Sequence, residues 1–180
     1  MRGSLGHMDD DSYLAFERSS EEKHELWDGQ VFMTGGASLV HNQIVMNLIV
    51  DLVDAQRDSG CDVLGVTMRV RVPTRGYVYP DVLIVCGPEV EGEDDVLLNP
   101  CTIIDVLEPW FNWGKVDGYR SMPSVRELLL VSQEGRHVEH HTRPPDGSWV
   151  LRSYRGDDAV PLLSPPRLLP LSRIYHRLDL

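Results

Sequence analysis

Lysine is the residue type that this chain most clearly lacks. Only two lysines, Lys23 and Lys115, occur in 180 residues, so fifteen of the 17 basic residues are arginines. The preference for arginine resembles a coding bias, which makes each retained lysine worth examining. An ammonium group is a compact charge with rotatable donors, and it suits contact with a phosphoryl oxygen or a water molecule.

Long apolar segments and paired cysteines are also missing. No apolar run approaches the length of a membrane span, and no stretch resembles a signal peptide, so we expect no membrane contact. The three cysteines, Cys61, Cys86 and Cys101, are odd in number and lack C-x-x-C spacing. They predict buried free thiols in a reducing cytoplasm, and they argue against a disulfide framework or a zinc site.

Positive charge is scarce relative to negative charge. The chain carries 28 acidic and 17 basic residues, a formal net charge of −11. A surface that binds nucleic acid is usually basic, so the acidity lowers the expectation of a nucleic-acid partner. It does not exclude one, because a bound metal cation becomes the largest nearby charge in its site.

The length and the composition are those of one globular domain. A chain of 180 residues that is 42% hydrophobic and 25% charged can bury a sizeable core. Residues 1–7 resemble the remnant of an expression tag, so the predicted domain covers residues 8–180.

Helical periodicity is clearest after Ser38, which is the candidate N-terminal cap. Apolar residues at Val40, Ile44 and neighbouring helical positions predict a helix that runs to about Arg57. Weaker patterns predict two short helical pieces over residues 12–27, a helix over residues 112–121 and a closing helix over residues 171–178.

Continuous apolar runs predict the centre of a sheet. Residues 81–86, 102–107 and 127–131 are typical of strands that are buried on both faces. Further strands are expected at residues 30–33, 61–64 and 68–72, and a hairpin at residues 136–142 and 148–154. The order predicts an α/β or α+β fold with a mixed central sheet, flanking helices and a C-terminal antiparallel hairpin.

Two acids occupy these predicted central strands. Asp81 follows Pro80 at the start of one strand, and Asp105 lies inside another, ten residues before Lys115. A carboxylate within a buried strand is costly unless it is paired or bound to metal. Two acids and a lysine suggest a metal-dependent phosphodiesterase site, because a hard cation neutralises the phosphate and activates water.

Each of these residues also has a simpler interpretation. Asp81 fits a turn at a strand start, Asp105 an ion pair with an arginine, and Lys115 an exposed helix position. Glu25 fits a helix surface, and His41 fits a local hydrogen bond at a helix start.

Two further clusters of polar residues could suggest binding sites, but a structural explanation is favoured for each. His137, His140 and His141 could suggest a metal site, but the alternation along the strand favours an exposed hairpin face. The acidic residues between positions 87 and 99 are typical of a solvated loop.

Several short segments together resemble one protein family. They lie at residues 13–16, 25–31, 35–42, 68–70, 79–82, 104–107, 115–120 and 123–127. In combination they resemble the Uma2 family, formerly DUF820, over nearly everything after residue 12. The resemblance implies an endonuclease with a restriction-endonuclease-like PD-(D/E)xK core that cleaves DNA or another phosphodiester.

The resemblance also implies roles for individual residues. Asp81 and Asp105 match the two acids of the family and would hold Mg²⁺ or Mn²⁺, with the Val106 main-chain carbonyl as a further ligand. Lys115 matches the lysine on the following helix, which would orient or deprotonate the attacking water, or stabilise the phosphorane-like charge. Glu25 matches the acid of the N-terminal helix, which would add a metal ligand or bind a metal-bound water.

His41 matches the histidine that starts the long helix in the family. The segment 108–114 departs from the family pattern, because it is shorter, lacks Ser and Thr, and places Phe111 or Asn112 where an Asp is expected. This departure and the acidic charge favour an alternative, a catalytically degenerate nuclease-fold module that acts as an interaction or regulatory protein. A third hypothesis is a metal-dependent hydrolase of small molecules, which requires a closed apolar pocket.

Three aromatic residues lie beside the candidate site in the sequence. Trp110, Phe111 and Trp113 could stack on bases, but core or interface packing is the more common role of such residues. Aromatic residues are enriched in interface cores, and two-fold dimers are the commonest closed assemblies. We therefore expect a homodimer formed through this segment or the C-terminal hairpin.

Overall fold

The computed structural model describes residues 4–56, 59–93 and 95–180. The helices of this part are α1 (Asp10–Ser19), α2 (Leu39–Gln56), α3 (Gly114–Ser121) and α4 (Leu171–Ile174). The strands are β1 (Ser4–His7), β2 (His24–Trp27), β3 (Gln30–Met33), β4 (Asp62–Gly65), β5 (Arg69–Val72), β6 (Gly76–Val78), β7 (Val82–Val85), β8 (Val90–Glu91), β9 (Val96–Leu97), β10 (Thr102–Leu107), β11 (Glu127–Ser132), β12 (His137–Thr142), β13 (Val150–Arg155), β14 (Ala159–Leu163) and β15 (Pro166–Pro170).

The central sheet is mixed, as the apolar runs predict. Within the described residues its order is β13-β12-β11-β10-β7-β4, and β10 runs parallel to β11 but antiparallel to β7. Strand β7 is buried throughout and alternates between two cores, with Val82 and Ile84 on one face and Leu83 and Val85 on the other. Burial on both faces is the reason for the continuous apolar runs.

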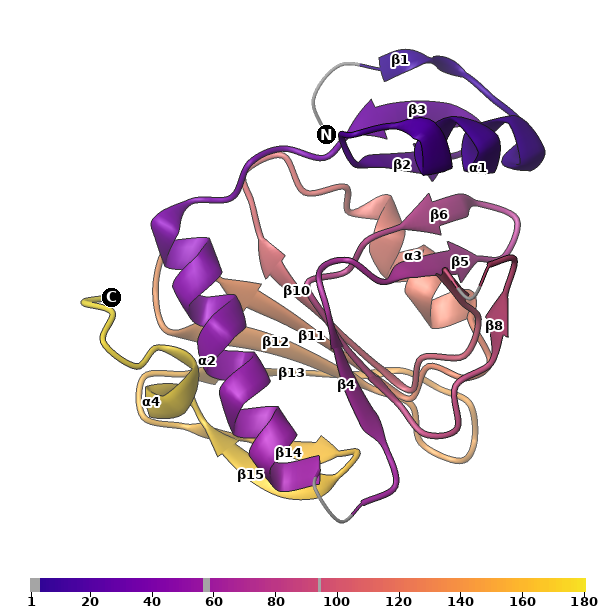
Figure 1. Cartoon of the computed structure of the whole chain (residues 1–180). Coiled ribbons are helices and arrows are strands. Elements are labelled where there is room, and N and C mark those ends of the chain that lie inside the picture. Colours follow the sequence, from indigo (N-terminus) through magenta and orange to yellow (C-terminus); the bar gives the residue numbers. More distant parts are fainter. Residues whose placement is uncertain (1–3, 57–58, 94) are drawn as a thin grey trace.

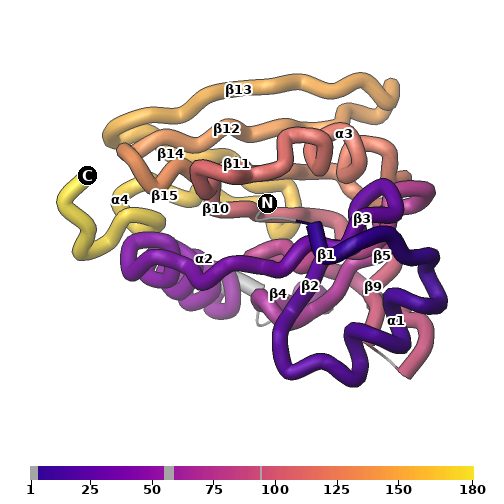
Figure 2. The backbone as a smooth tube through the Cα atoms, turned by 90° about the horizontal axis from the view of Figure 1, so that it is seen from above, coloured from indigo at the N-terminus to yellow at the C-terminus, as the bar shows by residue number. Residues whose placement is uncertain are grey.

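Different elements cover the two faces of this sheet. Helix α2, the β14–β15 hairpin and α4 pack on one face through a single hydrophobic cluster (Figure 1). Helix α3 and a second sheet, in the order β1-β3-β2-β6-β5-β9-β8, pack on the other face. Helix α1 lies on the outer side of that second sheet, far from the β12–β13 hairpin (Figure 2).

Helix α2 begins as the sequence predicts. The Ser38 side-chain oxygen accepts a hydrogen bond from the His41 main-chain N–H at 3.0 Å, so Ser38 caps the helix. Ile44 and Leu48 are fully buried against the central sheet. The expected end of the helix at Arg57 lies outside the described residues. In the part of the chain that the structure describes, no helix is long and apolar enough to cross a membrane.

The prediction of a second helical piece before Trp27 is wrong. Helix α1 ends at Ser19, and the Ser20 N–H bonds back to the Glu17 carbonyl, so the Ser-Ser pair closes a helix. The next residues form β2, which is buried at every position and pairs with β3 and β6. Strand β6 is distant in the sequence, but β3 follows β2 directly after the two-residue Asp28-Gly29 turn, which is a local signal for a hairpin.

The predictions for the C-terminal region are confirmed in part. The β12–β13 hairpin forms as predicted, with Gly147 in the left-handed region at φ 81° within its turn. The closing helix is shorter than predicted, because α4 covers only Leu171–Ile174, and the β14–β15 hairpin was not expected. The segment set aside as a tag remnant adds β1 to the edge of β3, while its origin stays a prediction.

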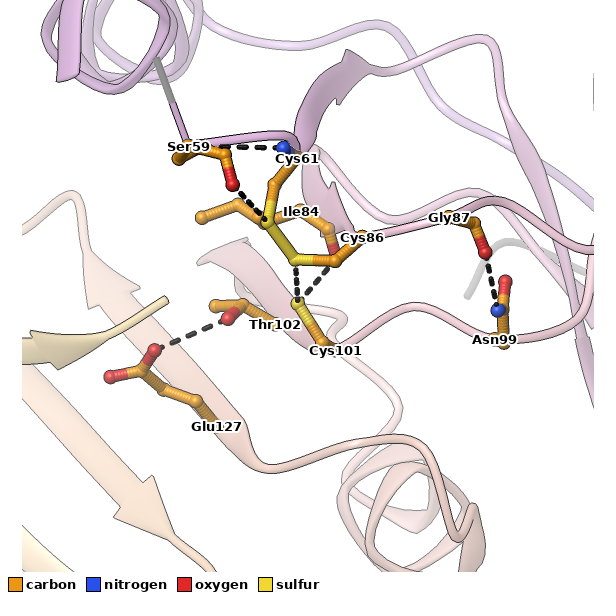
Figure 3. Close-up of a disulfide and its surroundings, with 9 residues drawn as sticks. All are labelled: Ser59, Cys61, Ile84, Cys86, Gly87, Asn99, Cys101, Thr102 and Glu127. Atoms are coloured by element: carbon orange, nitrogen blue, oxygen red, sulfur yellow. Dashed lines mark hydrogen bonds between the residues drawn. A yellow bond between two sulfur atoms is a disulfide. The ribbon is translucent and has the colours of Figure 1, made fainter. Parts of the chain in front are cut away.

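The prediction of three free thiols is wrong for two of them. Cys61 and Cys86 form a disulfide, and Cys101 is free (Figure 3). The antiparallel register of β4 and β7 pairs Asp62 with Val85, which places Cys61 directly opposite Cys86. A separation of 25 residues carries no local signal of this pairing.

Helix α3 packs closely because Gly118 leaves room for its neighbours. A methyl group added there would meet the Trp27 ring at 2.5 Å and Val72 at 2.9 Å. We expect Gly118→Ala to lower the free energy of unfolding by about 1 kcal/mol or more through overpacking. The control Gly135→Ala adds a methyl group with nothing within 4 Å. Urea unfolding of both variants checks this, and equal stabilities would contradict it.

Candidate functional site

One cavity brings together all the residues that the sequence singles out for chemistry. Its volume is about 480 Å³. Its wall includes Glu25, His41, Asp81, Asp105, Val106 and Lys115. These residues come from the second sheet, from the start of α2, from two central strands and from α3. The geometry is therefore made by elements that are distant in the sequence.

The two central acids face each other across neighbouring strands. In the β7–β10 register, Val82 pairs with Ile104, so the next pair along the ladder is Asp81 and Asp105. The Asp81 main-chain N–H points to Asp105 Oδ1 at 3.4 Å, and the Val106 N–H donates to Asp81 Oδ2 at 2.8 Å. The antiparallel ladder explains why two residues 24 positions apart share one site.

Asp105 points toward α3 because strand side chains alternate between faces. Ile103 lies in the cluster on the α3 side, and Asp105 shares that face. The hydroxyl of Tyr119 on α3 donates to Asp105 Oδ2 at 3.0 Å. The Asp105 side chain is almost fully buried, with a relative exposure of the residue of only 4%.

Lys115 forms a buried ion pair with Glu25. The Lys115 Nζ lies 2.7 Å from Glu25 Oε1, which also accepts a hydrogen bond from the Tyr79 main-chain N–H at 2.9 Å. The expected position of Glu25 on an N-terminal helix is wrong, because this residue lies on β2. The alternative interpretation of Lys115 as an exposed helix residue is also wrong, since both residues are buried.

His41 contacts the other central acid. Its Nε2 lies 3.3 Å from Asp81 Oδ2. Burial lowers the pKa of His41, but the hydrogen bond and the charge of Asp81 outweigh burial and raise it above its ordinary value. His41 therefore supplies a second positive charge to the site at mildly acidic pH, from the first turn of α2.

The acids outnumber the cations in this cavity. Burial raises the pKa of Asp105 to about 7, against the charge of Lys115, and the charges of Asp81 and Glu25 raise it further. Burial lowers the pKa of Lys115, but Glu25 and Asp105 together raise it above its ordinary value. Lys115 is thus charged at neutral pH. Asp105 is partly protonated at neutral pH, because the positive charge in the site does not balance the negative charge.

This charge imbalance fits a hard divalent cation. Asp81 and Asp105 converge, and Mg²⁺ is commonly held by one or two carboxylates with water completing its shell. Among the described residues, no group of three or more His, Cys, Asp or Glu side chains could hold a metal ion. The fit therefore rests on the two opposed aspartates and on the raised pKa of Asp105.

Two tyrosines contact the site without having been assigned a role from the sequence. Tyr119 holds Asp105, and the backbone of Tyr79 holds Glu25. A signal for Tyr119 exists, because it follows Lys115 by four residues and so lies on the same face of α3. Tyr79 directly precedes Pro80 and Asp81, but its contact with β2 depends on tertiary packing.

The histidines of β12 are not exposed, which corrects the interpretation of an exposed hairpin face. His140 and His141 are both almost fully buried. The His140 Nε2 lies 2.6 Å from Glu127 Oε1, and His141 lies beside Arg120 of α3. On the face that carries His141, His137 and Glu139 are only partly buried, so this face is neither exposed nor fully covered, and alternation alone could not show that.

The acidic segment after β7 is likewise not wholly a solvated loop. It forms the short strands β8 and β9. Asp95 bonds to Arg18 and Arg69 at 2.9 Å and 3.0 Å. These contacts tie α1 and β5 to the segment, while Asp94 lies outside the described residues.

Comparisons with known proteins point to one family. A profile named Uma2, described as "Putative restriction endonuclease", matches residues 10–174. Two proteins of Synechocystis sp., "Uncharacterized protein slr1290" and "Uncharacterized protein sll1609", are 28% identical over 173 residues and 29% identical over 154 residues. The alignments cover 93% and 82% of this chain, and 91% and 87% of the relatives.

A solved structure has the same fold. It is the crystal structure of an Anabaena variabilis protein described as "a putative nuclease belonging to DUF820". It superposes with a TM-score of 0.74 at 13% sequence identity, covering 93% of this chain and 97% of that chain. The mixed sheet with flanking helices is therefore shared with a nuclease-like protein.

The raised pKa of Asp105 makes stability depend on pH in the metal-free protein. The ordinary value is 3.8 and the folded value is about 7, so the native state holds a proton that the unfolded chain releases. The contribution of Asp105 is fully present below about pH 4 and is lost as pH rises through about 7. We expect Asp105→Asn to lack this loss.

Urea unfolding in the presence of a chelator checks this between about pH 4.5 and 5.5. In this window His41 is protonated in the folded protein, because its pKa is raised from 6.5, and it is largely protonated in the unfolded chain, so it adds little slope. The wild-type free energy of unfolding should fall relative to that of the variant as pH rises. Parallel pH profiles would contradict the burial argument for Asp105.

Proposed function

The chain belongs to the Uma2 family, and on this premise we propose that it is a metal-dependent endonuclease that hydrolyses phosphodiester bonds of DNA. The observation that carries the proposal is the pair of opposed acids, Asp81 and Asp105, in one cavity with a charged lysine. Phosphodiester hydrolysis needs neutralisation of the phosphate charge and an activated water. A cation held by the two acids would supply both, and the lysine would add a positive charge.

Asp81 and Asp105 would hold Mg²⁺ or Mn²⁺, with the Val106 carbonyl as a third candidate ligand. A bound cation would neutralise the phosphate and lower the pKa of its water. The opposed carboxylates, one of them with a raised pKa, support this role. Binding of the cation would favour the ionised form of Asp105 and release its proton.

Lys115 acts as a charge and not as a base. Its pKa is raised by the neighbouring carboxylates, so it keeps its proton at neutral pH. A fixed, buried ammonium at the wall of the cavity stabilises the negative charge that develops on the phosphoryl oxygens. Glu25 holds the lysine in place, the Tyr79 N–H holds Glu25, and both act on the substrate only through the lysine.

Tyr119 and His41 orient the two aspartates from opposite sides. Tyr119 uses its hydroxyl proton on Asp105 Oδ2, which leaves Asp105 Oδ1 facing Asp81. His41 contacts Asp81 Oδ2, the oxygen that also receives the Val106 N–H. Both contacts restrict the carboxylates to one arrangement, which lowers the cost of binding a cation.

A non-catalytic module is the second candidate function. The specific observation is the acidic rim of the cavity, where Glu21, Glu22 and Glu108 accompany the inner acids. Such a rim opposes the approach of a polyanion.

A homodimer and a cytoplasmic location are also part of the proposal. Trp113, with 58% exposure, offers an apolar surface for contact between two copies of the chain.

Metal binding is the first test of the proposal. At about one hundred times the Kd, Mn²⁺ should stabilise the wild-type protein by about 2.7 kcal/mol, which a melting curve resolves. Asp105→Asn and Asp81→Asn should each lose the rise in melting temperature. Asp117→Asn is the control, because this α3 acid is 80% exposed and lies off the cavity. Equal shifts in all four proteins would remove the two aspartates from the metal site.

The two lysines provide a matched pair for testing catalysis. Lys23 and Lys115 both line the cavity, but the Lys23 Nζ donates to the Val66 carbonyl at 3.0 Å near the rim. We expect Lys115→Met to lower DNA cleavage with Mn²⁺ by about 100-fold or more while keeping metal affinity. Lys23→Met should cleave at nearly the wild-type rate.

Plasmid nicking and oligonucleotide cleavage measure both rates. Full activity of Lys115→Met would overturn the assignment of the lysine. Absence of cleavage by the wild-type protein across metals and DNA substrates, with metal binding intact, would favour the non-catalytic module.

A further inference from the structure

The three cysteines meet at the end of β7 that is remote from the candidate site. Asp81 precedes this strand and Cys86 follows it, so the two residues mark its opposite ends. Cys86 is bonded to Cys61, beside β4, and its Sγ lies 3.9 Å from the Sγ of Cys101, beside β10 (Figure 3). Cys86 therefore has a sulfur neighbour just before each of the two strands that flank β7.

A second cavity opens onto two of these cysteines, Cys86 and Cys101. Its volume is about 720 Å³, and its wall includes Cys86, Glu89, Cys101, Ser124, Arg126 and Arg143. Cys86 is exposed, whereas Cys61 and Cys101 are partly buried. A small molecule in this cavity would thus reach the Cys86 end of the disulfide first.

The cavity wall carries more positive than negative charge. Within the described part of the chain, neither Arg126 nor Arg143 forms an ion pair with an acid, and Glu89 is the acid on the wall. Burial and the nearby charge of Arg126 both lower the pKa of Arg143. The buried Ser124 hydroxyl has no hydrogen-bond partner among the described residues. Arg143 donates to the main-chain carbonyls of Met122 and Pro123, so the exposed Arg126 is the group best placed to bind a ligand with a carboxylate.

We propose that Cys61, Cys86 and Cys101 form a thiol–disulfide exchange site that accepts a small thiol bearing a carboxylate. The thiolate of the ligand attacks Cys86 Sγ, forms a mixed disulfide and releases the Cys61 thiolate, which takes a proton from water. Cys101 then attacks Cys86 Sγ, gives its proton to solvent and expels the ligand as a thiolate. The disulfide moves from Cys61 to Cys101, with no net oxidation.

The ligand thiol has a clear function in this scheme. Burial raises the pKa of Cys101, so at neutral pH Cys101 is mostly a thiol, which is a poor nucleophile. Attack by Cys101 on Cys86 Sγ is therefore slow, both in the Cys61–Cys86 disulfide and in the mixed disulfide. A ligand that arrives as a thiolate attacks the exposed Cys86 first and replaces Cys61 as its partner.

The exchange would remove the covalent link between the edge strand β4 and its neighbour β7. Strand β4 is at the edge of the central sheet, and the Cys61–Cys86 bond ties one of its ends to β7. Just beyond its other end, Val66 lines the candidate active site and accepts the hydrogen bond from Lys23. Moving the disulfide to Cys101 releases β4 at the Cys61 end and leaves β7 tied to β10.

The test follows the partner of Cys86 in the full chain. The disulfide form is treated with limiting glutathione, quenched with acid, digested without reductant and mapped by mass spectrometry. We expect wild-type Cys86 to be found linked to both Cys61 and Cys101. In Cys101→Ser the reaction should stop at glutathione bound to Cys86. Cys86 linked only to Cys61, with no mixed disulfide in either protein, would overturn the proposal.

Charge recognition is tested in the same assay. Cysteamine carries an amine in place of a carboxylate, and at equal thiolate concentration glutathione should react about tenfold faster. Arg126→Gln should remove most of this preference, whereas Arg152→Gln, an exposed arginine on β13 outside the cavity, should keep it. Equal rates for the two thiols would overturn the assignment of the ligand. No step requires metal or DNA, so the outcome is independent of nuclease activity.

Discussion

The ion pair between Lys115 and Glu25 connects the helix on the central sheet to the second sheet. Its atoms lie 2.7 Å apart, and both side chains are buried. Removing ions from water costs several kcal/mol each, so such a pair is tolerated only where geometry and hydrogen bonds compensate the loss of hydration. Here the Tyr79 N–H and the close packing of α3 at Gly118 provide that geometry. The placement of α3 and β2 relative to each other depends on this contact.

The same constraint explains the chemistry of the cavity. Asp105 lies beside the ion pair and opposite Asp81, so the buried group carries more negative than positive charge. The imbalance raises the pKa of Asp105 and makes a divalent cation the natural complement of the site. The overall acidity of the chain is therefore compatible with phosphodiester chemistry, provided that the cation and Lys115 face the substrate.

Sequence patterns predicted the elements whose burial is visible in consecutive residues. Strands β7, β10 and β11 are covered on both faces, so each leaves a continuous apolar run that identifies it. Helix α2 shows both its spacing and its Ser38 cap. The patterns failed at β2, because its four buried residues resemble part of a short amphipathic helix when taken alone, although the Asp28-Gly29 turn to β3 is a local hairpin signal.

The sequence by itself determined the class of fold, the central strands, the family resemblance and the identity of the residues that line the cavity. Residue type and apolar periodicity are local properties, and they carry that information. Only the tertiary structure decided that Asp81 faces Asp105, that Glu25 holds Lys115 from a strand, and that Cys61 pairs with Cys86. Strand register and helix packing set those contacts, and both depend on residues far apart in the chain.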